Sequence, residues 1–326
     1  MSKLSKLLTN FPQFVRDAKL FRKIVDGPAA AAPPRKPKPE RPAPAKAHPL
    51  PTLNLAKESK LTALEQRLVK GSRRFLRYDA PPEVVERVVR RLGSSLREFM
   101  LATGFEDRDY EQYVREFLHT CEANPALGAA RTTAGGSLVW LFVLARTLSP
   151  RVIVESGVFK GASLYTLHSA CPDASVHAFD IDLSNLLYAH SAIHYHEGDW
   201  SEALPRAEGP TDLCYFDDHI NNCLRVRQAY DQGFRHLIFD DSPEIGELHK
   251  WRFPGVPTIQ MVHHQTLEPG EWVEWVWKDK KLRYTYREED THGVKDLLDF
   301  VVELPSLSSL TGRPTGVQTY VRLKDR

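Results

Sequence analysis

Five short apolar segments alternate with helical segments over residues 152–239, and this alternation constrains the fold more than any other feature of the sequence. The apolar segments cover residues 152–154, 176–179, 193–195, 213–216 and 237–239. Strands that alternate with helices at this spacing form right-handed crossover units and hence a parallel sheet. The pattern predicts an α/β domain with a Rossmann-like sheet over residues 132–326, in which residues 272–277, 282–286 and 317–323 add terminal strands.

A carboxylate follows each of the five segments. In chain order they are Glu155, Asp180, Asp199, the pair Asp217 and Asp218 with His219 behind it, and the pair Asp240 and Asp241. The carboxyl ends of parallel strands meet at one edge of the sheet, where open α/β folds bind their ligands. A single aspartate after a strand is common in turns and helix caps, but five acidic strand ends in succession favour a binding site.

The first segment continues as VESGVFKGAS, with Gly157 and Gly161 before the next helix. Glycines at such a turn let the backbone approach a ligand closely. Their spacing differs from the G-x-G-x-x-G of dinucleotide-binding proteins. Asp180 lies 25 residues beyond Glu155, where a carboxylate can accept hydrogen bonds from both hydroxyls of a ribose.

Three further regions precede the predicted sheet. Residues 1–27 form a basic arm whose apolar residues recur at helical spacing, and 28–52 are a Pro/Ala/Lys-rich linker. Residues 53–131 read as a helical subdomain, with helices over 84–99 and 110–121. An amphipathic basic helix such as that of residues 1–26 can lie on an anionic membrane surface, and docking on a partner or on the chain's own body is the alternative.

The charge of the chain is unevenly distributed. Residues 1–56 hold 11 basic and 3 acidic residues, a net charge of +8, whereas the rest of the chain carries −6. A mildly acidic body argues against nucleic acid as a partner. No secretory signal is apparent, and the four cysteines form no metal-binding or disulfide pattern. These features predict a cytoplasmic protein, peripheral at the inner face of the membrane if its arm binds lipid, and they do not indicate an oligomeric state.

The motifs VESGVFKGAS, AFDID, EGDW, CYFDDH and LIFDDS together resemble those of class I methyltransferases that use S-adenosylmethionine (SAM). More narrowly they resemble the macrocin-type sugar O-methyltransferases and the related cephalosporin-hydroxylase-like group. The resemblance implies that Glu155, Gly157 and Gly161 form the SAM loop, that Asp180 binds the ribose, and that Asp199 and Trp200 lie beside the adenine. It also implies a divalent metal held by Asp217, or Asp218 in its place, with Asp240 and Asp241.

The resemblance therefore predicts a SAM-dependent O-methyltransferase that acts on a sugar hydroxyl of a glycan, glycolipid or secondary metabolite. Mg²⁺ suits carboxylate ligands, and it can orient a hydroxyl and lower its pKa. His219 or Asp218 would then accept the proton.

Several alternatives stay open. Asp240 and Asp241 can instead cap a helix near residues 243–248, and His219 can be a helix-start or supporting residue. For the whole chain, the alternative is a non-catalytic binding or scaffold protein that is recruited through its basic arm.

Overall fold

The computed structural model describes residues 75–76, 80–127, 129, 132–251 and 254–326. Within them a seven-stranded sheet has the order β3-β2-β1-β4-β5-β9-β8. Five strands run parallel to one another: β1 (Val152–Ser156), β2 (Ser175–Asp180), β3 (Ile193–Glu197), β4 (Leu213–Phe216) and β5 (His236–Phe239). β9 (Thr319–Leu323) runs antiparallel to both β5 and β8 (Leu298–Glu303). The predicted Rossmann-like α/β fold is confirmed.

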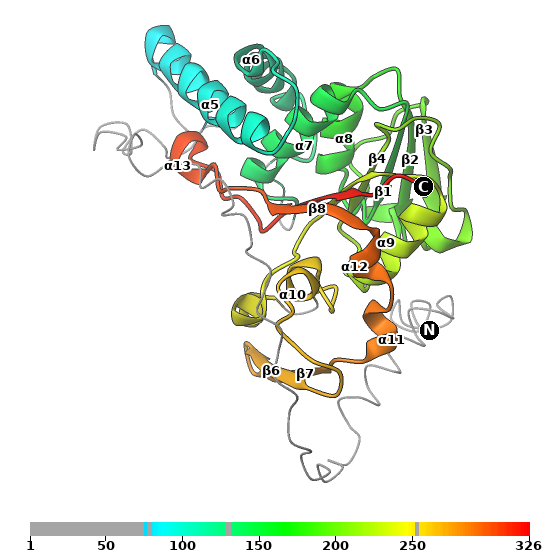
Figure 1. Cartoon of the computed structure of the whole chain (residues 1–326). Helices are drawn as coiled ribbons and strands as arrows, with labels where there is room; N and C mark the ends of the chain where they lie inside the picture. The colour runs from blue at the N-terminus through cyan, green and yellow to red at the C-terminus, as the bar shows by residue number, and fades with distance from the viewer. Residues whose placement is uncertain (1–74, 77–79, 128, 130–131, 252–253) are drawn as a thin grey trace, which may run out of the picture.

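The strand predictions differ from the structure in three places. β1 continues two residues past residue 154, so Glu155 lies inside the strand rather than after it. The segments β6 (Trp272–Trp277) and β7 (Lys280–Thr285) are strands, but they form a separate antiparallel hairpin beyond α10 (Ile259–His263) (Figure 1). β8 was missed because only Val301 and Val302 are buried in it, one in each core, between the exposed Asp299 and Glu303.

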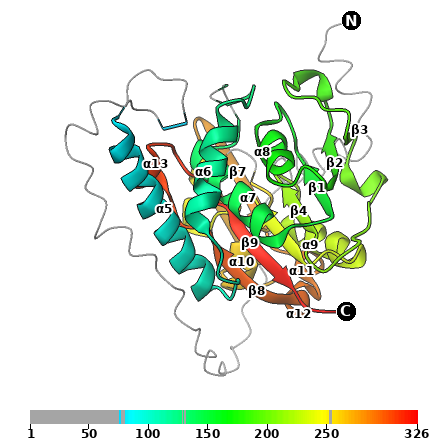
Figure 2. The same cartoon turned by 90° about the horizontal axis from the view of Figure 1, so that it is seen from above.

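Four helices gather on one side of the sheet (Figures 1 and 2): α5 (Pro82–Ala102), α6 (Tyr110–Cys121), α7 (Gly135–Leu148) and α8 (Ala162–Ala170). α7 is apolar and buried on nearly every side, as expected of a helix enclosed between a sheet and a further helical layer. α5 begins at the predicted Pro82 and approaches α6 so closely at Gly93 that an added Cβ would lie 2.5 Å from Cγ of Glu111. One continuous apolar core joins α5 and α6 to the sheet.

A second core packs on the opposite face of the sheet, under α9 (Asn222–Asp231), α10 and α12 (Val294–Leu297). The remaining short elements are η1 (Leu183–Asn185), η2 (Trp200–Glu202), η3 (Ile245–Lys250), α11 (Glu288–Thr291) and α13 (Ser308–Thr311). Only the single turns η1 and η2 connect β2 to β3 and β3 to β4, so the β3 edge of the sheet lacks crossover helices in the described structure.

Several predictions fall outside the described residues. The arm at 1–27, the linker at 28–52 and the helical pattern of residues 61–68 all lie there, and the boundaries of the predicted helical subdomain stay a prediction. Over the described ranges, the helices are too short or too polar to cross a membrane.

Candidate functional site

The order of the strands reverses between β1 and β4, and Glu155, Asp217 and Asp218 stand at the ends of these two strands. The loop after β1 presses directly against the loop after β4, because a Cβ on Gly157 would collide with the backbone carbonyl of Asp217. Gly157 also has a φ of 97°, which other residues rarely adopt. In open α/β sheets this crevice at the reversal point is the ligand-binding position.

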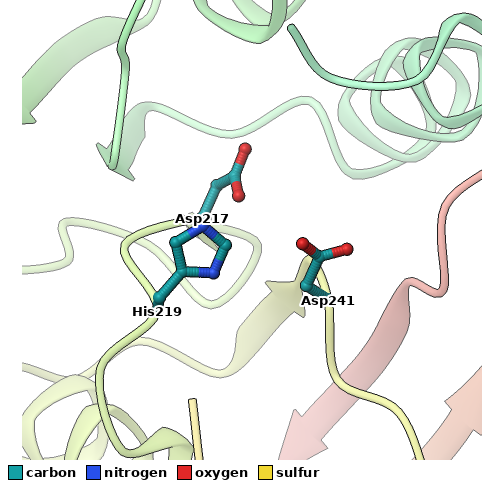
Figure 3. A group of neighbouring side chains, drawn as sticks. All are labelled: Asp217, His219 and Asp241. Carbon is teal, nitrogen blue, oxygen red and sulfur yellow. The ribbon is translucent and has the colours of Figure 1, made fainter. Parts of the chain in front are cut away.

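Asp217, His219 and Asp241 come together at this position (Figure 3). One ligand atom from each lies within 4.8 Å of the other two, and the three side chains form a triangle in Figure 3. The residues come from the loops after β4 and β5. His219 and Asp241 both have left-handed backbone conformations, with φ of 56° and 48°. Such conformations are costly for non-glycine residues and cluster at functional sites.

The carboxylates at this position repel one another. Burial, followed by the charges of Asp240 and Asp241, raises the pKa of Asp217 well above its usual range. Burial and the neighbouring Asp241 likewise raise the pKa of Asp240. Burial raises the pKa of Asp241, against a hydrogen bond from the side chain of Trp251 and the charge of His219. A divalent cation among these groups would offset both the burial and the repulsion.

The structure brings two of the three predicted metal carboxylates, Asp217 and Asp241, together with His219. The third, Asp240, is half-buried beside them, with a buried Oδ1 that has no hydrogen-bond partner among the described residues. The alternative that Asp240 and Asp241 cap a helix is wrong, because the next helical turn, η3, is capped by Glu244. The alternative placement of His219 at a helix start is also wrong, since α9 begins at Asn222 under an Asn221 cap.

Two other predicted site carboxylates are paired with one buried cation. Arg225, with 1% of its side chain exposed, donates from Nε to Asp218 Oδ2 at 2.8 Å and from Nη1 to Asp199 Oδ1 at 3.2 Å. Ser156 also donates to Asp218, at 2.6 Å. Burial alone would raise the pKa of Asp199, but the hydrogen bonds and charge of Arg225 outweigh it and lower that pKa. A carboxylate held this way is poorly placed to accept a proton, which disfavours Asp218 as the general base.

Trp200 lies in the core beneath this ion network. Its side chain is fully buried, its ring centroid is 5.1 Å from that of Phe216, and the guanidinium of Arg225 stacks over both rings. The predicted neighbours of the adenine, Asp199 and Trp200, are thus a salt-bridge partner and a packing residue here. Their contact with a cofactor stays a prediction.

The remaining predicted cofactor residues surround the loop after β1. Asp180 ends β2, and its carboxylate accepts hydrogen bonds from the backbone N–H of Phe159 at 2.6 Å and of Asp182 at 2.9 Å. Gly161 has a φ of 82° and precedes the first residue of α8. The carboxylate of Asp180 therefore lies against the glycine loop, as the SAM assignment requires.

Glu155 is fully buried at the same loop. Its Oε1 accepts a 2.5 Å hydrogen bond from Ser163, and its Oε2 has no partner among the described residues. Burial, opposed by the Ser163 hydrogen bond, raises the pKa of Glu155 to about 8. A buried and half-satisfied carboxylate of this kind suits a cationic or hydrogen-bonding ligand.

Glu155→Gln should flatten part of the pH dependence of stability. A carboxyl whose pKa is raised in the folded state stabilises the protein below its unfolded pKa, and this contribution is lost as pH rises through the folded value. In the ligand-free protein, the free energy of unfolding should fall by about 1 kcal/mol for each pH unit between pH 5 and 8 through this group. Urea denaturation of both proteins at pH 5, 6, 7 and 8 measures the difference, and parallel profiles would contradict the assigned pKa.

Two residues that support the site carry no motif in the sequence. Arg225 sits in a polar helical segment without a motif, so only the fold reveals that it reaches two strand ends. Trp251 follows η3 and hydrogen-bonds Asp241, while its own carbonyl accepts from Nε1 of Trp275 in the β6–β7 hairpin at 3.1 Å. Trp251 is the last residue of the segment that resembles the methyltransferases, but nothing in the sequence linked it to Asp241.

Neither a scan against protein-family models nor a search of curated proteins found a match. Solved structures similar to the chain include one described as cmcI-N160 SAH, with 28% identity and a TM-score of 0.29, covering 32% of this chain and 59% of that one. The SAH-bound Podospora anserina methyltransferase PaMTH1 has 16% identity and a TM-score of 0.37, covering 76% and 98%. The O-methyltransferase from Bacillus cereus in complex with SAH has 13% identity and a TM-score of 0.38, covering 72% and 99%. TM-scores this low carry no functional assignment.

Proposed function

We propose that this chain is a SAM-dependent O-methyltransferase assisted by a divalent metal ion. The observation that carries the proposal is the convergence of Asp217, His219 and Asp241 within 4.8 Å, at the strand-order reversal and beside the glycine loop after β1. Methyl transfer from a sulfonium mainly requires that the nucleophile be held in line and activated. The glycine loop that would hold the cofactor lies beside the groups that would hold the cation. The reaction requires these two sites to be neighbours.

The glycine loop and its acidic neighbours would hold the cofactor. Gly157 and Gly161 would leave room for close backbone approach, and Asp180 at the end of β2 would accept hydrogen bonds from the ribose hydroxyls. Glu155 offers its unpartnered Oε2 from inside the loop, where a protonated amine or a hydrogen-bond donor of the cofactor would satisfy it.

Asp217 and Asp241 would hold the metal ion, with His219 as the proton acceptor. Hard carboxylate oxygens suit Mg²⁺ or Mn²⁺, and such an ion orients a hydroxyl and lowers its pKa. His219 is exposed, so the proton that its ring nitrogen accepts from the acceptor hydroxyl can pass on to solvent. Asp218 and Asp199 are paired with Arg225, so we assign neither of them to metal binding or proton transfer.

The acceptor would be a small molecule or glycan with a free hydroxyl. A sugar hydroxyl of a glycan, glycolipid or secondary metabolite follows from the motif resemblance of residues 132–251. Contact with the inner face of a membrane through residues 1–26 would bring a lipid-linked acceptor within reach, and lipid-vesicle binding by the full chain would test it.

Calorimetric titration with SAM and with S-adenosylhomocysteine, each with and without Mg²⁺, tests the proposal. We expect micromolar binding of both ligands. Asp180→Asn should weaken it at least about tenfold, because the charged acceptor of the ribose hydroxyls is lost. Asp231→Asn, on the exposed side of α9, is the matched control. Equal affinity of Asp180→Asn and the unaltered chain would remove the ribose assignment, and no binding of either ligand would favour the scaffold alternative.

A further inference from the structure

Three histidines lie together on one face of the sheet, and none of them belongs to the group of Asp217, His219 and Asp241. His194 and His196 belong to the edge strand β3, separated by one residue, and His177 lies on the neighbouring strand β2. His177 and His194 are direct partners in the β2–β3 register. Side chains two apart on a strand, and register partners on adjacent strands, project from the same face. All three imidazoles therefore project from one face.

The rings are already in contact. Nδ1 of His177 lies 3.3 Å from Nε2 of His196, and the two rings are nearly parallel at 16°. The ring of His194 stacks on His177 with centroids 4.8 Å apart. Two nitrogens bound to one tetrahedral zinc ion at the usual Zn–N distance lie about 3.3–3.4 Å apart. In this structure the two nitrogens share a hydrogen bond and the ring of His196 stacks on Phe179, with centroids 4.3 Å apart. A bound ion would replace that hydrogen bond without drawing the two nitrogens further apart.

We propose that His177, His194 and His196 bind a borderline divalent ion of the Zn²⁺ type, with water in the remaining position. Three imidazoles and an open position form a known zinc ligand set, and neutral imidazole suits zinc better than Mg²⁺. His194 is exposed, so its ring can turn from the stacked position toward the ion at little cost. The proposal is independent of the proposed methyl transfer.

The surroundings of the cluster prepare it for this role. Oγ of Ser175 lies 3.3 Å from Nε2 of His177, which directs the other nitrogen of that ring toward His196. Hydrogen bonds of this kind orient metal-binding histidines. Burial, then the neighbouring His194 and His196, lowers the pKa of His177 to about 4, and burial also lowers that of His196. His177 is therefore neutral and free to bind metal at neutral pH.

The ion would stabilise the pairing of the edge strand β3 with β2. β3 is an edge strand, hydrogen-bonded only to β2. In the described structure the connections that precede and follow it contain only the single turns η1 and η2. A ligand set that spans β2 and β3 links the edge strand to its neighbour. Binding to the folded state alone raises stability, so excess Zn²⁺ should raise the Tm by on the order of 5 °C.

The experiment is a zinc titration of untagged, chelator-treated full-length protein by calorimetry. The Asp241→Asn variant serves as the background, because it weakens the acidic site that also attracts zinc. In this background we expect one zinc equivalent to bind. Adding His194→Ala or His196→Ala should remove that event or weaken it at least about tenfold, and Ser175→Ala should weaken it about tenfold.

His249→Ala is the control, because His249 is an exposed histidine on η3, remote in the chain from the cluster. It should bind zinc as the background does. His194→Ala changes an exposed side chain, so its expected Tm in the presence of chelator is that of the background, which separates loss of zinc from loss of fold. Zinc binding unchanged by His194→Ala and His196→Ala, or absent from the background, overturns the proposal.

Discussion

Replacing Asp241 with asparagine should abolish the Mg²⁺ dependence of methyl transfer and lower kcat about a thousandfold. A metal ion that polarises the acceptor contributes several kcal/mol to the transition state, and a thousandfold corresponds to about 4 kcal/mol. Asparagine keeps the size of the side chain and tolerates the left-handed φ of 48°, so the loop should keep its shape. Initial rates at several Mg²⁺ concentrations, with SAM affinity measured separately, give the result.

Two comparisons separate the possible causes of such a loss. SAM affinity of Asp241→Asn should stay within about threefold of the unaltered protein, because Asp241 lies after β5 and the proposed cofactor loop lies after β1. His219→Gln should also lower kcat, by about a hundredfold or more, but should keep the Mg²⁺ response, since it removes the proton acceptor. Unchanged metal-dependent turnover of Asp241→Asn would refute the metal site.

The sequence was sufficient for the parallel part of the sheet because its central strands β1, β4 and β5 are buried on both faces, and β2 and β3 occur in the chain at the same spacing. Buried parallel strands read as short apolar runs, and the acidic residues after them locate the ligand-binding edge without any knowledge of the packing. β8 was not recognised because its buried residues are only Val301 and Val302, between the exposed Asp299 and Glu303, and two residues are too short an apolar run to indicate a strand. Residues 272–277 were recognised as a strand, but local pattern cannot tell whether a strand joins the main sheet or pairs only with its neighbour.

At the site, sequence reasoning located the carboxylates but not their partners. Asp217, Asp218, Asp240 and Asp241 occupy equivalent places in the sequence, after strands four and five. Neighbouring residues point in different directions, so Asp217 and Asp241 meet His219, whereas Asp218 turns to Arg225 and Ser156. Which member of an Asp-Asp pair faces the ligand depends on side chains far away in the chain, and single-sequence motifs do not contain that information.

Arg225→Met should lower the free energy of unfolding by about 3–5 kcal/mol at pH 7, the largest stability effect we expect from one substitution. Arg225 is almost fully buried and compensates Asp199 and Asp218, whose side chains are 23% and 13% exposed. Methionine fills much of the same volume but leaves two carboxylates without their cation. Removing one partner of a buried ion network costs more than the network itself contributes, because the remaining charges stay buried.

Arg227→Met is the matched control for this substitution. Arg227 lies two residues further along α9, and within the described residues its hydrogen bonds go to the backbone carbonyls of Asp290 and His292, both at 3.4 Å. Its loss should cost less than about 1 kcal/mol, as is usual for a partly exposed side chain without a charged partner. Urea denaturation of both variants at pH 7 gives the comparison.

The pH dependence of the stability difference between Arg225→Met and the unaltered protein shows whether the charge of Arg225 causes it. Arg225 lowers the pKa of Asp199 in the folded state, so the stabilisation is present above the unfolded pKa of about 4 and is lost as pH falls further. The gap between Arg225→Met and the unaltered protein should therefore be wide at pH 6–7 and narrow below about pH 4. Combining Arg225→Met with Asp199→Asn and Asp218→Asn should recover much of the loss, because no buried charge is left unpaired. A gap that is equally wide at every pH, with no recovery in the combined variant, would mean that Arg225 stabilises the fold by packing on Trp200 and Phe216 and not by its charge.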